Sequence, residues 1–224
     1  MSHSPRIALI HALTDSQVPA WQAFETHWPE ADIHNVLDDS LAMDLAAEGT
    51  LTEAMVQRFI TLGKYAASTG FKETETQAIL FTCSAFGPAI DAAKKQVDIP
   101  VLRPNEAAFE EALNAGNKIG LLVSFEKALP PLTNELKEMA AAAGKTIEVH
   151  TGIAEGALAA LKAGNEAEHD RLVAECAATL EDVDALVLCQ FSLARAAASI
   201  PDVAGRIVLT TPGSAIAKLK RLLA

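Results

Sequence analysis

The sequence has few basic residues, few aromatic residues and no long apolar run. Its 224 residues include 18 Lys and Arg against 29 Asp and Glu, which gives a formal net charge of −11. A chain this acidic lacks the basic field that binds nucleic acid or an anionic membrane surface, so we expect neither as a partner. No stretch approaches the roughly 20 apolar residues that span a bilayer, and residues 1–10 do not form a secretion signal. We therefore expect a cytoplasmic protein.

Motifs for cofactors and metals are also absent. No G-x-G-x-x-G or Walker sequence follows a predicted strand, which argues against a dinucleotide or a nucleoside triphosphate. The six His and three Cys include no C-x-x-C or H-E-x-x-H spacing, so no metal site is predicted. An odd number of widely spaced cysteines does not form a disulfide framework, so each could be a core residue, a nucleophile or an acid/base. We expect no cofactor.

Short β-branched runs alternate with longer runs rich in Ala and Leu along the whole chain. This alternation is typical of an α/β fold, in which helices cover both faces of a parallel sheet. The apolar content of the short runs fits strands that are buried on both faces. The predicted strands are residues 6–11, 32–36, 77–82, 101–102, 118–123, 146–150, 185–188 and 206–209.

A weak internal repeat divides the chain into two similar halves. Residues 6–10 resemble 118–122, and two strands, 78–82 and 185–188, are each followed by a cysteine, Cys83 and Cys189. We expect a first half over residues 1–103, completed by a C-terminal helix within 210–224, and a second half over 104–209. No flexible linker separates the halves, so a cleft between them is expected. Ligands of open α/β sheets bind at the carboxyl ends of the strands, where both cysteines lie.

Two thiols that face one cleft suit proton transfer at a carbon next to a carbonyl group. One thiolate removes the proton, and the other thiol delivers a proton to the opposite face. The start of a helix can lower a thiol pKa from about 8.5 toward neutral pH. The alternative is that each cysteine fills the core, as free cysteines commonly do. We expect this core role for Cys176, which lies in a helical run of small apolar residues.

The cysteine segments resemble those of the aspartate/glutamate/hydantoin racemase superfamily, especially its hydantoin-racemase-like members. The resemblance rests on Thr-Cys-Ser-Ala-Phe-Gly-Pro at 82–88 and Leu-Cys-Gln-Phe-Ser at 188–192, with support from 37–41 and 210–212. It implies two Rossmann-like halves related by a pseudo-twofold axis and often a dimer. It also implies a cofactor-independent mechanism with Cys83 and Cys189 as the two bases. The superfamily also includes arylmalonate decarboxylases and maleate isomerases, so the fold does not fix the reaction.

The chain departs from the amino-acid racemases of this superfamily at three places. Those enzymes usually have Asn-Thr after the first cysteine and Thr after the second, where this chain has Ser84-Ala85 and Gln190. Many also have an Asn after the first strand, where this chain has His11. These differences argue against aspartate or glutamate as the substrate. Arylmalonate decarboxylases lack the first cysteine, so the presence of both favours a racemase or epimerase.

Several polar residues at strand ends are candidate substrate contacts. An enolate-like intermediate needs donors near its oxygen, and Ser84, Gln190 and the backbone N–H groups after each cysteine are the best placed. Ser124 and Thr211 follow other strands and could equally be helix N-caps. His11 is expected only to contact substrate, because a lone His at a strand end is more often a hydrogen-bonded residue than a base. Arg103 or Arg195 could hold a carboxylate, with a surface ion pair expected for Arg195.

The sequence thus predicts a cofactor-independent racemase or epimerase that acts on a small amino-acid or hydantoin-like compound. Cys83 and Cys189 are the predicted catalytic residues, and a homodimer is the predicted assembly. The alternatives are a decarboxylase or cis–trans isomerase on the same fold, a binding protein without turnover, and a redox switch through a Cys83–Cys189 disulfide.

Overall fold

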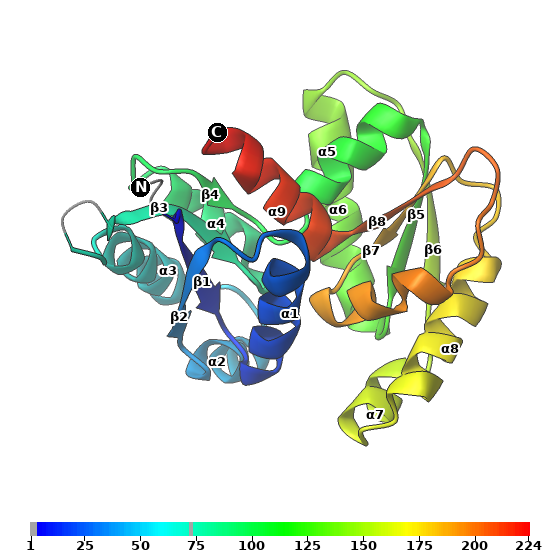
Figure 1. Ribbon diagram of the computed structural model, residues 1–224, viewed down its shortest axis with the longest axis horizontal. Helices are drawn as coiled ribbons and strands as arrows, with labels where there is room; N and C mark the ends of the chain where they lie inside the picture. Colours follow the sequence, from blue (N-terminus) through cyan, green and yellow to red (C-terminus); the bar gives the residue numbers. More distant parts are fainter. Residues whose placement is uncertain (1–3, 72–73) are drawn as a thin grey trace. The chain divides into compact units, whose positions relative to one another are not determined.

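Parallel strands form two four-stranded sheets with the same strand order (Figure 1). The computed structural model describes residues 4–71 and 74–224. The first sheet has the order β2-β1-β3-β4, and the second has the order β6-β5-β7-β8. The strands are β1 Arg6–His11, β2 Asp32–Leu37, β3 Thr76–Phe81, β4 Val101–Leu102, β5 Lys118–Val123, β6 Glu148–Ile153, β7 Ala185–Leu188 and β8 Ile207–Thr210.

All eight predicted strands are confirmed as elements, and the α/β class is correct. Four of them, β1, β4, β5 and β7, have the predicted bounds. β6 begins two residues later than expected, because its pairing with β5 starts only where β5 itself starts, at Lys118 opposite Glu148. The β-propensity of single residues does not predict the first residue of an edge strand, because that residue depends on where the partner strand begins.

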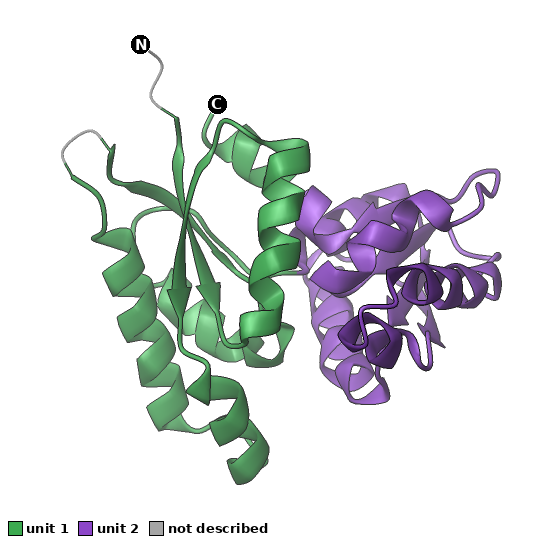
Figure 2. Ribbon diagram, turned by 60° about the horizontal axis from the view of Figure 1, so that its bottom comes forward, with its two compact units in different colours: residues 1–104, 215–224 green, residues 105–214 purple. Residues whose placement is uncertain are grey.

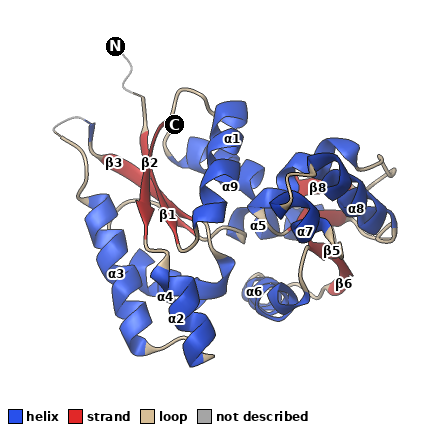
Figure 3. Ribbon diagram, turned by 90° about the horizontal axis from the view of Figure 1, so that it is seen from below, coloured by secondary structure: helices blue, strands red, loops and turns tan. Residues whose placement is uncertain are grey.

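Helices follow most of the strands and cover both faces of each sheet (Figure 3). Thr52 caps α3, because its hydroxyl accepts the N–H of Met55. Gly144 lies just beyond α6 with φ +66°, a conformation that favours glycine. The α-helices are α1 Gln17–His27, α2 Ser40–Glu48, α3 Glu53–Ala67, α4 Gly87–Lys94, α5 Glu106–Ala115, α6 Leu129–Ala142, α7 Ala157–Lys162, α8 Glu166–Ala178 and α9 Thr211–Leu222. The 3-10 helices are η1 Thr14–Ser16, η3 Ser84–Phe86, η4 Glu126–Ala128 and η5 Phe191–Ser199.

The chain folds into two compact units, shown in green and purple in Figure 2. Unit 1 comprises Met1–Pro104 and Ala215–Ala224, and unit 2 comprises Asn105–Ser214. The C-terminal part of α9 therefore belongs to unit 1. There Lys220 donates to the backbone oxygen of His27 at 3.0 Å and lies 5.7 Å from the ring centre of Trp28.

Each unit has its own apolar core. In unit 1, the rings of Phe59, Phe81 and Phe86 pack between the sheet and the helices α3 and α4, with Phe59 5.4 Å and 4.7 Å from the other two. In unit 2, one face of the sheet packs against α5 and α6, and the other packs against α8 and η5. Alternate residues of β7 enter these two cores, so a shift of one residue changes the face on which a side chain lies.

Candidate functional site

The predicted site residues lie where strands end, at the carboxyl edges of the two sheets. His11, Cys83 and Ser84 belong to unit 1, whereas Ser124, Cys189, Gln190 and Thr211 belong to unit 2. All strands within a sheet are parallel, so the residues of each unit share one edge.

Cys83 lies two residues beyond β3 and precedes η3. Its backbone is extended, with φ −121° and ψ 116°, and its side chain is half-buried beside the core of unit 1. Burial raises the pKa of the thiol, and the backbone N–H of Ala85, which donates to the sulfur, offsets part of that rise. The thiolate therefore has a fixed donor at the position where its charge forms. Ser84, the next residue, is also partly exposed.

A hydrogen-bond network surrounds His11 at the same edge of unit 1. The ring is fully buried, and Nε2 lies 2.8 Å from Oδ1 of Asn35, which also accepts the indole N–H of Trp21 at 2.9 Å. Because that oxygen can only accept, His11 carries its proton on Nε2. Nδ1 then accepts from the hydroxyl of Thr82 at 2.8 Å or that of Ser16 at 2.9 Å. Burial lowers the pKa of His11, consistent with a neutral ring.

The sequence did not reveal the partners of His11. Asn35 lies within β2 and Thr82 follows β3, so the network forms only when the strands on both sides of β1 are in register. Both ring nitrogens have partners within unit 1. Contact between His11 and a substrate stays a prediction.

Cys189 directly follows β7 and is only 2% exposed. Its sulfur lies in the core formed by the sheet, α5 and α6, and the thiol donates to the backbone oxygen of Val187 at 3.3 Å. Burial raises the pKa of the thiol far above its usual range. A backbone hydrogen bond with Leu122 lowers it slightly, and the negative charge of Glu135 on α6 raises it further. Cys189 is thus held as a neutral thiol.

Gln190 and Ser124 are brought together at the edge of unit 2. The side-chain oxygen of Gln190 accepts the backbone N–H of Ser124 at 2.7 Å and its hydroxyl at 2.8 Å. A backbone N–H can only donate, so these contacts fix which end of the Gln190 amide is oxygen. In the described part of the chain, the amide nitrogen has no hydrogen-bond partner. Its two N–H groups remain as donors beside the end of β7.

The hydrogen bonds of β3 and β7 show which residues are equivalent in the two units. β1 and β5 are the second strands of their sheets and both have six residues, with Ile10 and Leu122 at the fifth position. The N–H of Thr82 donates to the oxygen of Ile10 at 3.0 Å, and the N–H of Cys189 donates to the oxygen of Leu122 at 3.0 Å. Thr82 and Cys189 therefore occupy the same position.

It follows that Cys83 is equivalent to Gln190. Both are extended residues that precede a 3-10 helix, with φ and ψ of −121° and 116° in Cys83 and of −135° and 142° in Gln190. Both side chains are partly exposed, whereas Thr82 and Cys189 are buried. The sequence repeat paired the two cysteines with each other, and the strand register corrects this pairing by one residue.

The remaining candidates have structural partners or are buried. Arg195 forms ion pairs with Glu166 and Asp170, as expected for a surface position. Arg103 forms a bidentate ion pair with Asp91 of α4. Thr211 is the first residue of α9 and is fully buried, and its hydroxyl has no hydrogen-bond partner among the described residues.

Cys176 is half-buried in α8 and packs against the core, in keeping with its predicted structural role. No group of three or more His, Cys, Asp or Glu among the described residues could hold a metal ion. No helix in the described ranges is long and apolar enough to cross a membrane.

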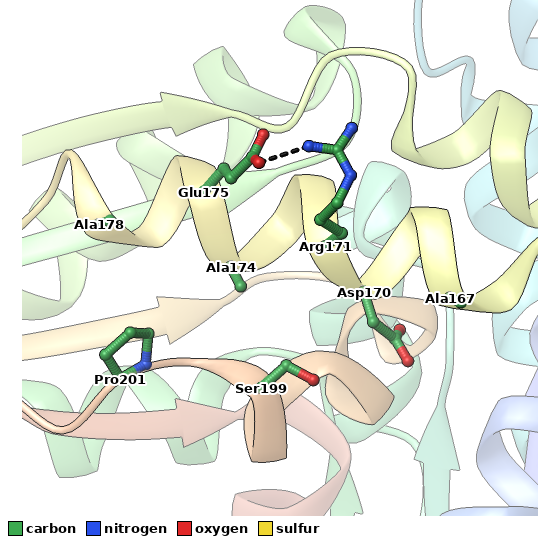
Figure 4. Close-up of a pocket in the computed structure, with 8 residues that line it drawn as sticks. All are labelled: Ala167, Asp170, Arg171, Ala174, Glu175, Ala178, Ser199 and Pro201. Carbon is green, nitrogen blue, oxygen red and sulfur yellow. Dashed lines mark hydrogen bonds and ion pairs between the residues drawn. The ribbon is translucent and has the colours of Figure 1, made fainter.

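A surface pocket of about 640 Å³ lies on unit 2, but none of the predicted site residues lines it (Figure 4). It runs along α8, the last residue of η5 and the segment that follows η5. Its lining residues are Ala167, Asp170, Arg171, Ala174, Glu175, Ala178, Ser199 and Pro201.

The sequence matches the model of a known family over most of its length. A family model described as Asp/Glu/Hydantoin racemase matches residues 22–219. The chain belongs to the Asp/Glu/hydantoin racemase family. This membership supports an isomerase of the racemase type that acts on a small molecule.

Solved structures with the same fold include enzymes with different activities. An aspartate racemase homologue from Pyrococcus horikoshii OT3 has a TM-score of 0.69 and 16% identity, with 97% of this chain and 98% of that chain covered. Allantoin racemase from Pseudomonas fluorescens has a TM-score of 0.68 and 14% identity, with 97% and 90% covered. A point mutant of arylmalonate decarboxylase has a TM-score of 0.67 and 13% identity, with 97% and 93% covered. No curated protein matches the sequence significantly.

Proposed function

We propose that this protein of the racemase family transfers a proton at a carbon next to a carbonyl group of a small molecule, without a cofactor. The thiol of Cys83 carries the proton. The observation that supports this role is its place at the end of β3, half-buried, with the N–H of Ala85 donating to its sulfur. A buried thiolate with a fixed donor is a suitable base for a weakly acidic C–H bond.

Proton removal leaves an enolate oxygen, whose charge needs hydrogen-bond donors. We propose that the Ser84 hydroxyl and the Gln190 amide N–H groups serve this purpose. Ser124 acts through Gln190, since its N–H and hydroxyl hold the amide oxygen. His11 and Thr211 are weaker candidates for substrate contact, because both are fully buried.

The sequence alone predicted racemisation with Cys83 and Cys189 as the two bases. The family assignment supports it, and the burial of Cys189 counts against it. The specific alternative is decarboxylation, which needs one proton donor, and the fold likeness to arylmalonate decarboxylase makes it a candidate. The substrate class is proposed as amino-acid, hydantoin-like or malonate-like compounds. The dimeric state and the cytoplasmic location also remain predictions.

The test is solvent deuterium incorporation at the α-carbon, followed by NMR and chiral chromatography. The panel comprises both enantiomers of aspartate, glutamate, allantoin and 5-benzylhydantoin, together with phenylmalonate. We expect exchange or carbon dioxide release with at least one compound and a loss of at least about 1,000-fold in the Cys83→Ala variant, because its acid/base group is gone. Binding without exchange or carbon dioxide release would favour a binding protein.

A further inference from the structure

The equivalence of Cys83 and Gln190 has a consequence for the chemistry of the site. In a pseudo-symmetric two-thiol site, the second thiol would stand at the position that matches Cys83. In this chain that position holds an amide, which does not exchange protons as an acid or base near neutral pH.

We propose that this enzyme transfers protons with Cys83 alone, and that Gln190 replaces the second thiol and binds a carboxylate or carbonyl oxygen of the same substrate. This inference rests on the proton-transfer function proposed above. Gln190 takes the place of Cys189 as the second residue that contacts the substrate. Protons are then transferred on only one face of the substrate.

The side chain of Cys189 lies on the face of the sheet opposite to that of Gln190, so it does not occupy the position of a second acid/base group that matches Cys83. Along β7, Val187 and Cys189 enter the core with α5 and α6, whereas Leu186 and Leu188 enter the core with α8 and η5. Gln190 continues the second set, because side chains of an extended segment alternate between faces. Cys189 also uses its S–H to donate to Val187.

The contacts of Gln190 indicate a prepared donor. Ser124 supplies two hydrogen bonds to the amide oxygen, which leaves the amide N–H groups as the donors available to a ligand. At the corresponding place in unit 1, one residue after β1, the chain has Ala12, which cannot supply the hydroxyl. Thus Ser124 and Gln190 occur together in one unit, and Ala12 and Cys83 occur together in the other. Two parallel N–H donors suit an anionic or carbonyl oxygen.

A single thiol limits the reaction to one face of the substrate. The Cys83 thiolate takes the α-proton, which leaves a thiol and an enolate, and the same thiol can return a proton or a solvent-derived deuteron with retention. With a malonate, loss of carbon dioxide leaves the same enolate. The Cys83 thiol then protonates it, and solvent reprotonates the thiolate. In both cases one enantiomer is used or formed.

The experiment first compares the reactivity of the thiols. The folded protein is alkylated with iodoacetamide at pH 8 and sampled over time by peptide mass spectrometry. We expect Cys83 to react at least about 50-fold faster than Cys189, since reactivity follows exposure and thiolate content. In the Gln190→Cys variant, the new sulfur should react within about tenfold of Cys83. Equal alkylation rates for Cys83 and Cys189, or an unreactive thiol in Gln190→Cys, would overturn the inference that position 190, and not Cys189, matches Cys83.

The second arm repeats the deuterium assay on the same panel with four proteins. In wild type and in Cys189→Ala, we expect exchange with retention or a single enantiomer of product, at rates that agree within about twofold. In Gln190→Cys, we expect racemisation to increase at least about tenfold, because an acid/base group now stands at the matching position. Cys83→Ala should be inactive.

The outcomes separate the two proposals. If Cys189→Ala abolishes exchange while its circular dichroism spectrum and melting temperature stay close to those of wild type, the one-thiol inference is wrong and the two-thiol reaction stands. Racemisation by the wild-type protein that survives in Cys189→Ala also overturns the inference. If labelling follows the expected order but no compound reacts with wild type or Gln190→Cys, the placement of Gln190 is supported and the proposed proton-transfer function fails.

Discussion

Ser124 donates both its backbone N–H, at 2.7 Å, and its hydroxyl, at 2.8 Å, to the side-chain oxygen of Gln190. Ser124 directly follows β5, and Gln190 lies two residues beyond the neighbouring strand β7, so the bonds join two loops at the carboxyl edge of the sheet. A flexible glutamine loses side-chain entropy when it is ordered, and pre-ordering before substrate binds removes this cost from the binding step.

The Ser124→Ala variant should therefore weaken substrate binding more than it slows the chemical step. It removes one of the two bonds to Gln190 and keeps the backbone N–H. Loss of a single neutral hydrogen bond is worth about 0.5–1.5 kcal/mol, so we expect KM to rise by about 2- to 13-fold with kcat within about twofold. Steady-state kinetics with the substrate found in the panel measure both constants.

The matched control for Ser124 is Ser68→Ala. Ser68 also donates its hydroxyl to one protein oxygen, that of Tyr65, but it lies on the exposed end of α3. Its KM should equal that of wild type. An equal change in both variants would mean that Ser124 acts on general stability and not on Gln190.

His11 should make the protein less stable in acid. Burial lowers its pKa below 6.5, so below that pH the unfolded chain binds a proton that the folded protein does not. Stability is therefore full above about pH 6.5 and falls as the pH drops toward the lowered pKa, by at most about 1.4 kcal/mol per pH unit from this group. Urea unfolding between pH 5 and pH 8 measures the slope.

In His11→Gln, this part of the slope should disappear, while stability at pH 8 falls by about 1–3 kcal/mol because Asn35 and the buried Thr82 lose their hydrogen bonds to the ring. His34→Gln is the control, because the side chain of His34 is 40% exposed and its ring bonds to Asp32, which is exposed as well. The explanation is wrong if wild type and His11→Gln lose stability in parallel as the pH falls.

Much of the fold followed from local patterns, but the site depended on register. β-branched runs predicted all the strands, and the end of β3 correctly marked Cys83 as an edge residue. The match of Cys83 with Cys189 failed because sequence comparison aligns identical residue types, whereas the units are related through strand hydrogen bonds. A slip of one residue along a strand moves a side chain to the other face, which no composition or spacing argument detects.

The partners of His11 were also beyond the sequence. Asn35 and Ser16 are ordinary polar residues in their own segments, and only the sheet brings them to the ring. One feature of the sequence does indicate that His11 has hydrogen-bond partners. His11 ends an apolar strand, and a polar side chain buried there requires hydrogen-bond partners from neighbouring strands.

Gly116 should tolerate no side chain, because it sits against Asp184 just before β5. A Cβ on Gly116 would lie 2.1 Å from the Oδ2 atom of Asp184, which accepts the backbone N–H groups of Asn117 and Lys118, both at 2.8 Å. Gly116→Ala must displace this carboxylate and leave both donors unpaired. We expect a loss of about 2–4 kcal/mol in the free energy of unfolding, measured by urea denaturation.

Asp184→Asn is the matched comparison for Gly116→Ala. It keeps the shape and one acceptor oxygen and removes the charge, so its loss should be smaller, about 1 kcal/mol. The steric account fails if Gly116→Ala unfolds within about 0.5 kcal/mol of wild type.

The pH dependence of the exchange rate should report the Cys83 thiol. Burial raises the pKa of this thiol and the Ala85 N–H only partly offsets the rise, so the reactive thiolate is a minor species at neutral pH. For α-proton removal by a thiolate, kcat/KM should then rise about tenfold per pH unit from pH 6.5 and level off only above pH 8.5, the ordinary thiol pKa.

Decarboxylation should show the opposite trend, because in that reaction Cys83 must begin as the protonated thiol. The direction of the profile, measured on wild type and compared with that of iodoacetamide alkylation at Cys83, therefore distinguishes a base from an acid. A rate independent of pH from 6.5 to 9.5 would mean that Cys83 does not transfer the proton.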